Sequence, residues 1–229
     1  MKYEYHWAYL TDPISEGEVA VWGNGSAVCV HNIYDPTPAF FKKADLIFVD
    51  PPWNLGNLNT FYTKAERSDY QTSFETFYMR LFEVIREVSP DVCYVEVGKQ
   101  YLAEFIMQMK KLFKYVTFYN SCYYHKNENR CYIIRGSWKA KKPYLDGMDE
   151  EDIISWICEN DTYTCILDPC MGQGLVGRYA AAAGRKFVGG ELNPKRLSVL
   201  LKAVPGYSIY KNSEITGGEF TGCSEEASC

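Results

Sequence analysis

The sequence has 229 residues, of which 47% are hydrophobic, and a formal net charge of −5 at pH 7. This length and apolar content suffice to fill one continuous core, so we expect a single domain over residues 1–213. The nine cysteines form no C-x-x-C pair and several lie inside apolar runs, which argues against a zinc or disulfide scaffold. No run approaches the ~18 apolar residues of a membrane span. The polar start at 1–9 does not resemble a secretory signal, so we expect a cytoplasmic protein without membrane contact.

Short apolar runs alternate with amphipathic segments along the chain, as in proteins built from strand-helix-strand units. Strands are predicted, in chain order, at 27–31, 45–50, 93–97, 115–124, 130–134, 164–168 and 186–191. Helices are predicted at 74–88, 101–113, 149–159, 174–183 and 193–204. This order predicts an α/β fold with a doubly wound, mostly parallel seven-stranded sheet that carries one antiparallel hairpin strand. Residues 214–229, rich in Gly, Ser, Thr and Glu, are predicted to form a disordered tail.

Three of the predicted helices have clear start signals. Thr72 and Glu75 have the spacing of a capping box, Asp149 can cap the helix that follows it, and Asn193 precedes a proline at the first helical position.

The segment 54–71 is polar, with the aromatics Phe61, Tyr62 and Tyr70, and is the longest irregular stretch that we predict. Irregular segments of this length in compact domains are usually functional or disordered. We predict a mobile lid over a substrate here, with an unstructured excursion as the alternative.

Two loop motifs end two of the predicted strands. Asp50-Pro51-Pro52-Trp53 follows the apolar run 46–49, and Asp168-Pro169-Cys170-Met171-Gly172-Gln173-Gly174 follows the run 165–167. Open α/β sheets hold ligands at the carboxyl ends of their strands, where the strand order reverses. The sequence therefore predicts one composite site, with the two motif strands side by side.

The second motif has features of a nucleotide-binding turn. Gly172 and Gly174 let the backbone approach a ligand closely, and the following helix presents its amide groups to an anion. The spacing matches neither a dinucleotide-binding fingerprint nor a P-loop. Glu191 ends the next strand, where an acidic side chain can accept hydrogen bonds from both hydroxyls of a ribose. An adenosine-containing cofactor fits this pattern.

Together the motifs resemble those of S-adenosylmethionine-dependent amino-methyltransferases. Leu167-Asp168-Pro169-x-x-Gly172-x-Gly174 is similar to their cofactor motif, Asp50 to Trp53 to their Asp-Pro-Pro-aromatic signature, and Lys142-Pro143 to a Lys-Pro element ahead of the cofactor motif. The catalytic motif comes first, as in the beta class of DNA methyltransferases, and the resemblance covers 26–204. It implies a Rossmann-like methyltransferase fold with S-adenosyl-L-methionine as cofactor. The cofactor residues it implies are Asp168, Pro169, Gly172, Gly174, Glu191, Asn193 and Lys142.

The resemblance gives the first motif a catalytic role. An exocyclic amine is a poor nucleophile because its lone pair is delocalised into the ring. The Asp50 carboxylate and the Pro51 carbonyl would accept its two hydrogen bonds and favour a tetrahedral nitrogen. Pro52 helps to stiffen the turn, and Trp53 can stack on the base. Transfer would be direct, and the three histidines show no metal-binding spacing.

Positive charge is concentrated in one part of the chain. Between Lys126 and Lys142 there are six cations and one anion, interleaved with aromatic residues, which suits a phosphate backbone with exposed bases. A solvated hairpin whose charges only maintain solubility explains the stretch equally well. The nucleic-acid-binding residues predicted here are Lys126, Arg130, Arg135, Lys139 and Lys141.

The sequence thus predicts methylation of the N6 amine of adenine in DNA. Trp53 is less usual than Tyr in the beta class, although adenine methyltransferases acting on messenger RNA share it, and no insertion is large enough for a separate recognition domain. The alternatives are RNA, a free nucleotide or cytosine N4 as substrate, or an inactive methyltransferase-like subunit that presents nucleic acid to a partner. The domain could also act as a homodimer. The biological role is left open between restriction-modification, regulation and virus defence.

Overall fold

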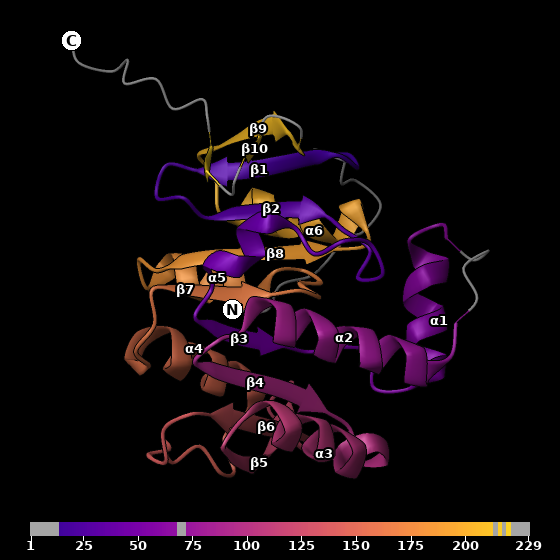
Figure 1. Cartoon of the computed structure of the whole chain (residues 1–229), viewed down its shortest axis with the longest axis vertical. Helices are drawn as coiled ribbons and strands as arrows, with labels where there is room; N and C mark the ends of the chain where they lie inside the picture. Colours follow the sequence, from indigo (N-terminus) through magenta and orange to yellow (C-terminus); the bar gives the residue numbers. More distant parts are fainter. Residues whose placement is uncertain (1–13, 68–71, 213–214, 217–218, 221–229) are drawn as a thin grey trace.

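The computed structural model describes residues 14–67, 72–212, 215–216 and 219–220 (Figure 1). Its centre is a nine-stranded mixed sheet in the order β5-β6-β4-β3-β7-β8-β2-β1-β9. The strands are β1 Glu18–Trp22, β2 Ala27–Val30, β3 Leu46–Val49, β4 Val92–Val97, β5 Tyr115–Tyr123, β6 Lys126–Ser137, β7 Cys165–Asp168, β8 Lys186–Glu191 and β9 Tyr207–Lys211. Among the described residues, no helix combines the length and the apolar character that crossing a membrane requires.

The middle of the sheet is parallel, and both edges are antiparallel. Strands β4, β3, β7, β8 and β2 run in one direction. The hairpin of β5 and β6 pairs antiparallel beside β4, and β1 and β9 continue the sheet beyond β2 with antiparallel pairing. The prediction of seven strands with one antiparallel strand was therefore wrong in the number of strands and in the second edge.

The edge that the sequence did not predict consists of β1 and β9. Strand β1 pairs with β2 on one side and with β9 on the other. Most side chains of β9 are at least partly exposed, as expected of an edge strand, so its hydrophobic pattern is weak. Beyond β9, the short strands β10 Ile215–Thr216 and β11 Glu219–Phe220 pair inside the segment predicted as a disordered tail. The rest of that segment lies outside the described residues.

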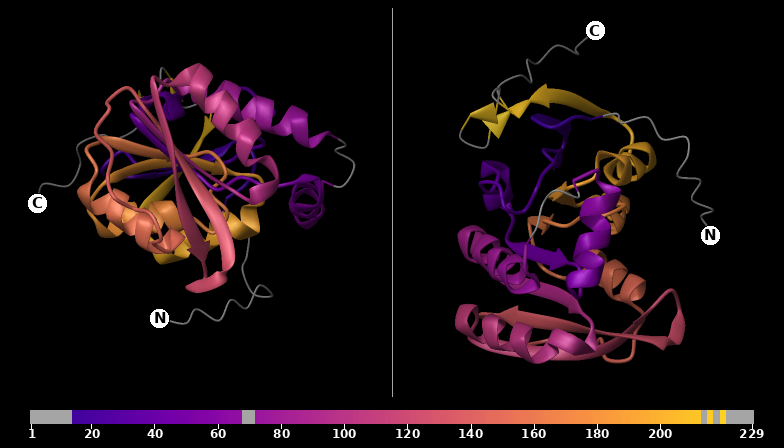
Figure 2. Two further views of the ribbon diagram at one scale, coloured as in Figure 1. Left: turned by 90° about the horizontal axis from the view of Figure 1, so that it is seen from below. Right: turned by 90° about the vertical axis from the view of Figure 1, so that its right-hand side faces the viewer.

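Helices cover both faces of the sheet, as the doubly wound prediction required (Figure 2). On one face lie η2 Ala39–Lys43, α2 Phe74–Val88, η3 Lys99–Tyr101 and α3 Leu102–Leu112. On the other lie α4 Glu150–Asn160, α5 Leu175–Ala182 and α6 Pro194–Ala203. Each face has its own apolar core, and α1 Leu55–Lys64 stands at the carboxyl ends of the parallel strands.

Side-chain caps fix where these helices begin. Asp149 caps α4 and Asn193 caps α6, each by accepting a hydrogen bond from the backbone N–H two residues later, which confirms both predicted starts. Helix α2 is capped by Ser73 rather than by the predicted Thr72. The capping Asp149 and Asn193 stand at two corners of the site described below, so the caps also position functional loops.

The strand order reverses between β3 and β7. Strand β3 leads along the chain to β4 on one side, while β7 leads to β8 on the other. The two strands pair in parallel with the register Leu46↔Ile166, so the prediction that the motif strands are neighbours is confirmed. Asp45 strengthens the pairing, because its carboxylate accepts hydrogen bonds from the backbone N–H groups of Thr164 and Cys165 at the start of β7.

Candidate active site

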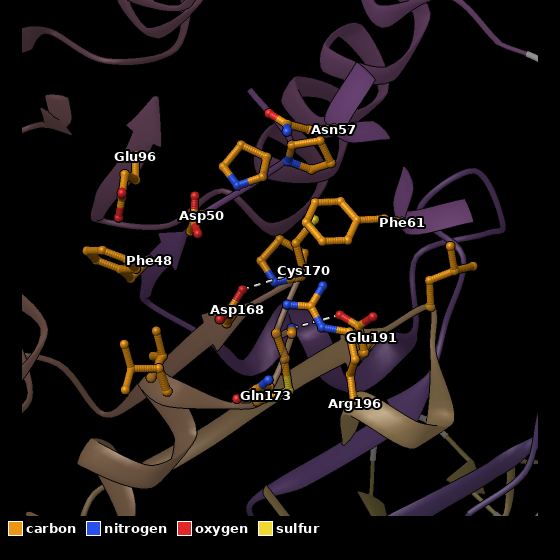
Figure 3. Close-up of a pocket in the computed structure, with 18 of the residues that line it drawn as sticks. Phe48, Asp50, Asn57, Phe61, Glu96, Asp168, Cys170, Gln173, Glu191 and Arg196 are labelled. Carbon is orange, nitrogen blue, oxygen red and sulfur yellow. Dashed lines mark hydrogen bonds between the residues drawn. The ribbon is translucent and has the colours of Figure 1, made fainter. Parts of the chain in front are cut away.

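A cavity of about 970 Å³ opens at this switch point, at the carboxyl ends of the central strands. Its lining includes residues 50–53 of the first motif and 168–173 of the second. Figure 3 shows Asp50 and Asp168 on the same side of this space, with Glu191 farther along. The two motifs that the sequence singled out therefore face one cavity.

Asp50 directly follows β3, and its carboxylate is open to the cavity although protein atoms surround it. Trp53 Nε1 donates a hydrogen bond of 2.9 Å to Asp50 Oδ1, which orients the carboxylate. Burial raises the pKa of Asp50 to about 6, while the Trp53 hydrogen bond and the Arg196 charge oppose the shift. At neutral pH the group is thus an ionised acceptor, and a carboxylate has about four acceptor positions, which leaves room for a ligand.

Aromatic side chains form the wall next to Asp50. The rings of Trp53 and Tyr123 meet edge to face at 5.4 Å, and Tyr124 extends from the hairpin tip with 74% of its surface exposed. Tyr124 and His125 both have positive φ, 60° and 51°. Such turns normally use Asn or Gly, so this tip is a strained conformation beside the cavity.

Asp149 holds this hairpin tip against α4. Its Oδ2 accepts from His125 N at 2.8 Å, and its Oδ1 accepts from Glu151 N at 3.1 Å. The side chains of these three residues place metal-ligand atoms within 4.8 Å of one another. The hydrogen bonds of Asp149 account for this arrangement without a metal ion.

The second motif wraps around Glu191. Glu191 Oε2 accepts from Gly172 N at 2.7 Å, and Oε1 accepts from Asn193 N at 3.0 Å. Gly172 and Gly174 have φ values of 53° and 72°, in the left-handed region that favours glycine. A Cβ at Gly174 would lie 2.5 Å from Leu200 Cβ, so the loop packs tightly on α6. These contacts hold the Glu191 carboxylate at the wall of the cavity.

Arg196 is a cavity residue that the sequence analysis missed. It lies in the first turn of α6, and its guanidinium group stacks on the Phe61 ring at 4.7 Å from the centroid. Burial raises the pKa values of Asp168 and Glu191, and the Arg196 charge opposes both shifts. No signal in the sequence marks this arginine, because a basic residue near a helix start is usually solvated.

The segment predicted as an irregular lid is largely the helix α1, so that prediction was wrong over 55–64. The helix starts at the Asp50 to Trp53 motif and contributes Asn57, Leu58, Phe61 and Tyr62 to the cavity wall. Its far end is tied to α6, because Asn193 Nδ2 donates to Lys64 O at 2.9 Å. Helix α1 thus connects the first motif to the start of α6, and residues 68–71 lie outside the described part of the chain.

Three of the predicted cofactor residues do not line the cavity. Gly174 packs against Leu200 and so shapes the loop that carries the lining residues, and Asn193 holds the far end of α1. Lys142 lies elsewhere: its Nζ donates to Thr117 Oγ1 at 3.3 Å, and it lines a separate groove of about 580 Å³ with Lys110. The assignment of Lys142 to the cofactor site is therefore corrected.

The predicted nucleic-acid-binding residues divide between the two ends of β6. Four are exposed: Lys126 and Arg130 near the hairpin tip, and Lys139 and Lys141 beyond the opposite end. Arg135 is different, because it is only 5% exposed and its Nε donates to the Tyr94 hydroxyl at 3.2 Å. Residues 133–137 of β6 are all buried, so both faces of this part of the strand are covered, which the charge pattern does not reveal. Arg135 is thus an internal residue, and its assignment to phosphate contact is corrected.

Comparison with known proteins places the fold. No protein-family profile matches the sequence, and no curated protein matches it. The solved M1.HpyAVI-SAM complex superposes with a TM-score of 0.56 at 14% identity, over 77% of this chain and 97% of that one. TTHA0409 from Thermus thermophilus, complexed with S-adenosyl-L-methionine, gives 0.54 at 17% identity, over 78% and 94%. The cytosine-N4-specific PvuII DNA methyltransferase gives 0.54 at 11% identity, over 79% and 86%.

The chain shares the fold of these proteins. The predicted methyltransferase-like α/β fold is thereby confirmed, apart from its strand count. In such folds ligands bind at the switch point, which is where the cavity with Asp50 and Glu191 opens.

Proposed function

We propose that this protein transfers a methyl group from S-adenosyl-L-methionine to the exocyclic N6 amine of adenine in DNA. One observation carries the proposal: Asp50, an oriented acceptor for an amine, and Glu191, an acceptor for a ribose, face a single cavity from motifs on neighbouring strands. The fold shared with a DNA methyltransferase and with two S-adenosylmethionine complexes supports it.

The cofactor fits the part of the cavity around Glu191. Each Glu191 oxygen accepts one backbone N–H, and a carboxylate has about four acceptor positions, so both oxygens can still accept a ribose hydroxyl. The cavity of about 970 Å³ is at the upper end of the roughly 300–1,000 Å³ of small-molecule sites, which suits a cofactor together with a base. When bound there, the cofactor supplies an electrophilic sulfonium methyl group.

The acceptor amine belongs beside Asp50. The Asp50 carboxylate and the Pro51 carbonyl accept hydrogen bonds from its two N–H groups. After transfer, the methylated nitrogen loses one proton along its existing hydrogen bond to the Asp50 carboxylate. Trp53 orients Asp50 through its indole N–H. The exposed Tyr124 ring lines the same cavity and offers a surface on which a base can stack once it has left the duplex.

The exposed cations are arranged along the β5-β6 hairpin. Lys126 and Arg130 lie near its tip beside the cavity, whereas Lys139 and Lys141 follow the opposite end of β6. At ~3.3 Å per residue, β6 rises roughly 23 Å from Arg130 to its end at Ser137, two residues before Lys139. This length corresponds to about seven base pairs of B-form DNA at 3.4 Å each, so one duplex lying along the hairpin would contact both groups.

Methylation of cytosine N4 is the second candidate, because the PvuII enzyme that shares the fold is cytosine-N4-specific. Transfer of labelled methyl groups to duplex DNA, single-stranded DNA and RNA tests the proposal. We expect label in DNA, and none with Asp50→Ala. Label in RNA alone would overturn the DNA substrate, and no label in any substrate would favour a subunit that only binds nucleic acid.

A further inference from the structure

A second acidic group lies next to Asp50 and has no role in the chemistry above. Strands β3 and β4 pair with the register Val49↔Val95, so the next residues along them, Asp50 and Glu96, are neighbours at the carboxyl edge. Glu96 is only 1% exposed, and among the described residues no backbone N–H and no Lys or Arg side chain donates a hydrogen bond to its carboxylate. It lines the cavity, as Figure 3 shows.

Glu150, in the first turn of α4, faces Glu96 across this corner. Carboxylate oxygens of Glu96 and Glu150 and the Cys131 sulfur lie within 4.8 Å of one another. Burial and the nearby Asp50 charge raise the pKa of Glu96 well above its ordinary value. They also raise the pKa of Glu150 to about 7, although a hydrogen bond with Glu96 opposes this shift. Neighbouring carboxylates in such a site cannot all be ionised, so Glu96 and Glu150 retain a proton between them.

Among the described residues, no Lys or Arg side chain neutralises this pair. Glu96 faces Asp50 from β3, Cys131 from β6 and Glu150 from α4, and Tyr124 at the hairpin tip faces Asp50 and Glu150. Arg196 acts on Asp50 from α6. A buried carboxyl group without a cationic or backbone partner is destabilising, so its position at the cavity wall indicates a ligand.

We propose that Glu96, in its protonated form, donates a hydrogen bond to the ring nitrogen beside the amine that Asp50 and Pro51 bind. The inference rests on the proposed function and specifies its substrate. Adenine has its N6 amine between the acceptors N1 and N7, and cytosine has its N4 amine beside N3. A neutral carboxylic acid can donate to such a nitrogen, whereas a carboxylate cannot. Glu96 would thus select a base whose exocyclic amine lies next to a ring nitrogen that accepts a hydrogen bond.

Substrates that lack the acceptor test this directly. Duplexes carrying adenine, 1-deazaadenine or 7-deazaadenine at the target position keep the amine and remove one ring nitrogen at a time. For wild-type protein we expect one of the two analogues to lower kcat/KM by about 10-fold or more, the effect of one lost hydrogen bond. If wild type methylates cytosine, 3-deazacytosine takes the place of these analogues.

Two substitutions at Glu96 complete the experiment. Glu96→Gln keeps an N–H donor and should retain the penalty for the analogue. Glu96→Leu has no donor, so it should methylate the natural base more slowly and show less than about a threefold penalty. Leucine replaces a buried acid with an apolar side chain of similar size, so folding should persist, which thermal unfolding and cofactor calorimetry check. Glu159→Gln, an exposed change on α4, is the matched control and should behave as wild type.

The outcomes separate the two proposals. If Glu96→Leu retains the full wild-type penalty, or wild type shows no penalty with any analogue, Glu96 does not contact the ring nitrogen and this inference fails alone. If wild type methylates no base, the proposed function fails and this inference with it.

Discussion

Gly174 gives a quantitative test of how the loop of the second motif is built, because Gly184 offers a matched control. Both have left-handed φ values, 72° at Gly174 and 68° at Gly184, so alanine at either position adds about 1–2 kcal/mol of backbone strain. A Cβ at Gly174 would also lie 2.5 Å from Leu200 Cβ, whereas nothing lies within 4 Å of one at Gly184. Carbon atoms normally approach to about 3.5–4.0 Å. Helix α6 must therefore shift, which costs a further ~1–3 kcal/mol.

We expect Gly174→Ala to lower the free energy of unfolding by about 2–5 kcal/mol and Gly184→Ala by about 1–2 kcal/mol. Urea unfolding followed by circular dichroism measures both values. Calorimetry on the folded variants should show weaker S-adenosylmethionine binding for Gly174→Ala alone, because the displaced loop carries the N–H that orients Glu191. Equal losses of stability in the two variants would refute the packing argument, and unchanged cofactor affinity in Gly174→Ala would refute the role of the loop in binding.

Three further substitutions test other contacts of the site and the sheet. Glu191→Gln sets an amide NH₂ group against a backbone N–H and replaces the charge-assisted hydrogen bond to the ribose, worth about 1.5–3 kcal/mol. Calorimetry should therefore give a Kd for S-adenosylmethionine about 10- to 150-fold higher. An unchanged Kd would contradict the ribose site. Trp53→Phe removes the hydrogen bond that lowers the pKa of Asp50. Methylation requires the Asp50 carboxylate, so the rate falls as pH drops through the Asp50 pKa, about 6 in wild type. The variant should have a higher Asp50 pKa, and the acid limb of its rate profile should lie at higher pH. An acid limb at the wild-type pH would mean that this hydrogen bond does not tune Asp50. Asp45→Ala, which removes the hydrogen bonds to the start of β7, should lower the free energy of unfolding by about 1–3 kcal/mol in urea, and unchanged stability would show that water replaces them.

The parallel centre of the fold could be predicted because its strands are buried on both faces and read as short apolar runs. Strand β9 escaped prediction because its side chains are mostly exposed at an edge. Helix α1 escaped because part of its surface lines a cavity rather than the core, so its apolar stripe is short. In both cases tertiary position, rather than local preference, determines the structure.

In the candidate site, too, some residues could be predicted from the sequence and others could not. Asp50 and Glu191 could be predicted because each ends an apolar strand at the sheet edge where ligands bind. Glu96 has the same signal, a charged residue near the end of the buried strand β4, and could have been found by the same argument. Arg196 could not, because the turn that brings it to the cavity depends on how α6 packs. Arg135 was misassigned because charge composition does not tell that both faces of β6 are covered around this residue.

The central claim is that one cavity brings a methyl donor to an amine bound by Asp50. Mass spectrometry of nucleosides from duplex DNA incubated with the protein and S-adenosylmethionine tests this claim most directly, with Asp50→Ala as control. We predict N6-methyladenine with wild type and none with Asp50→Ala, although calorimetry should show that the variant still binds the cofactor. Wild type that binds S-adenosylmethionine but yields no methylated nucleoside, or Asp50→Ala that methylates as fast as wild type, would contradict the account.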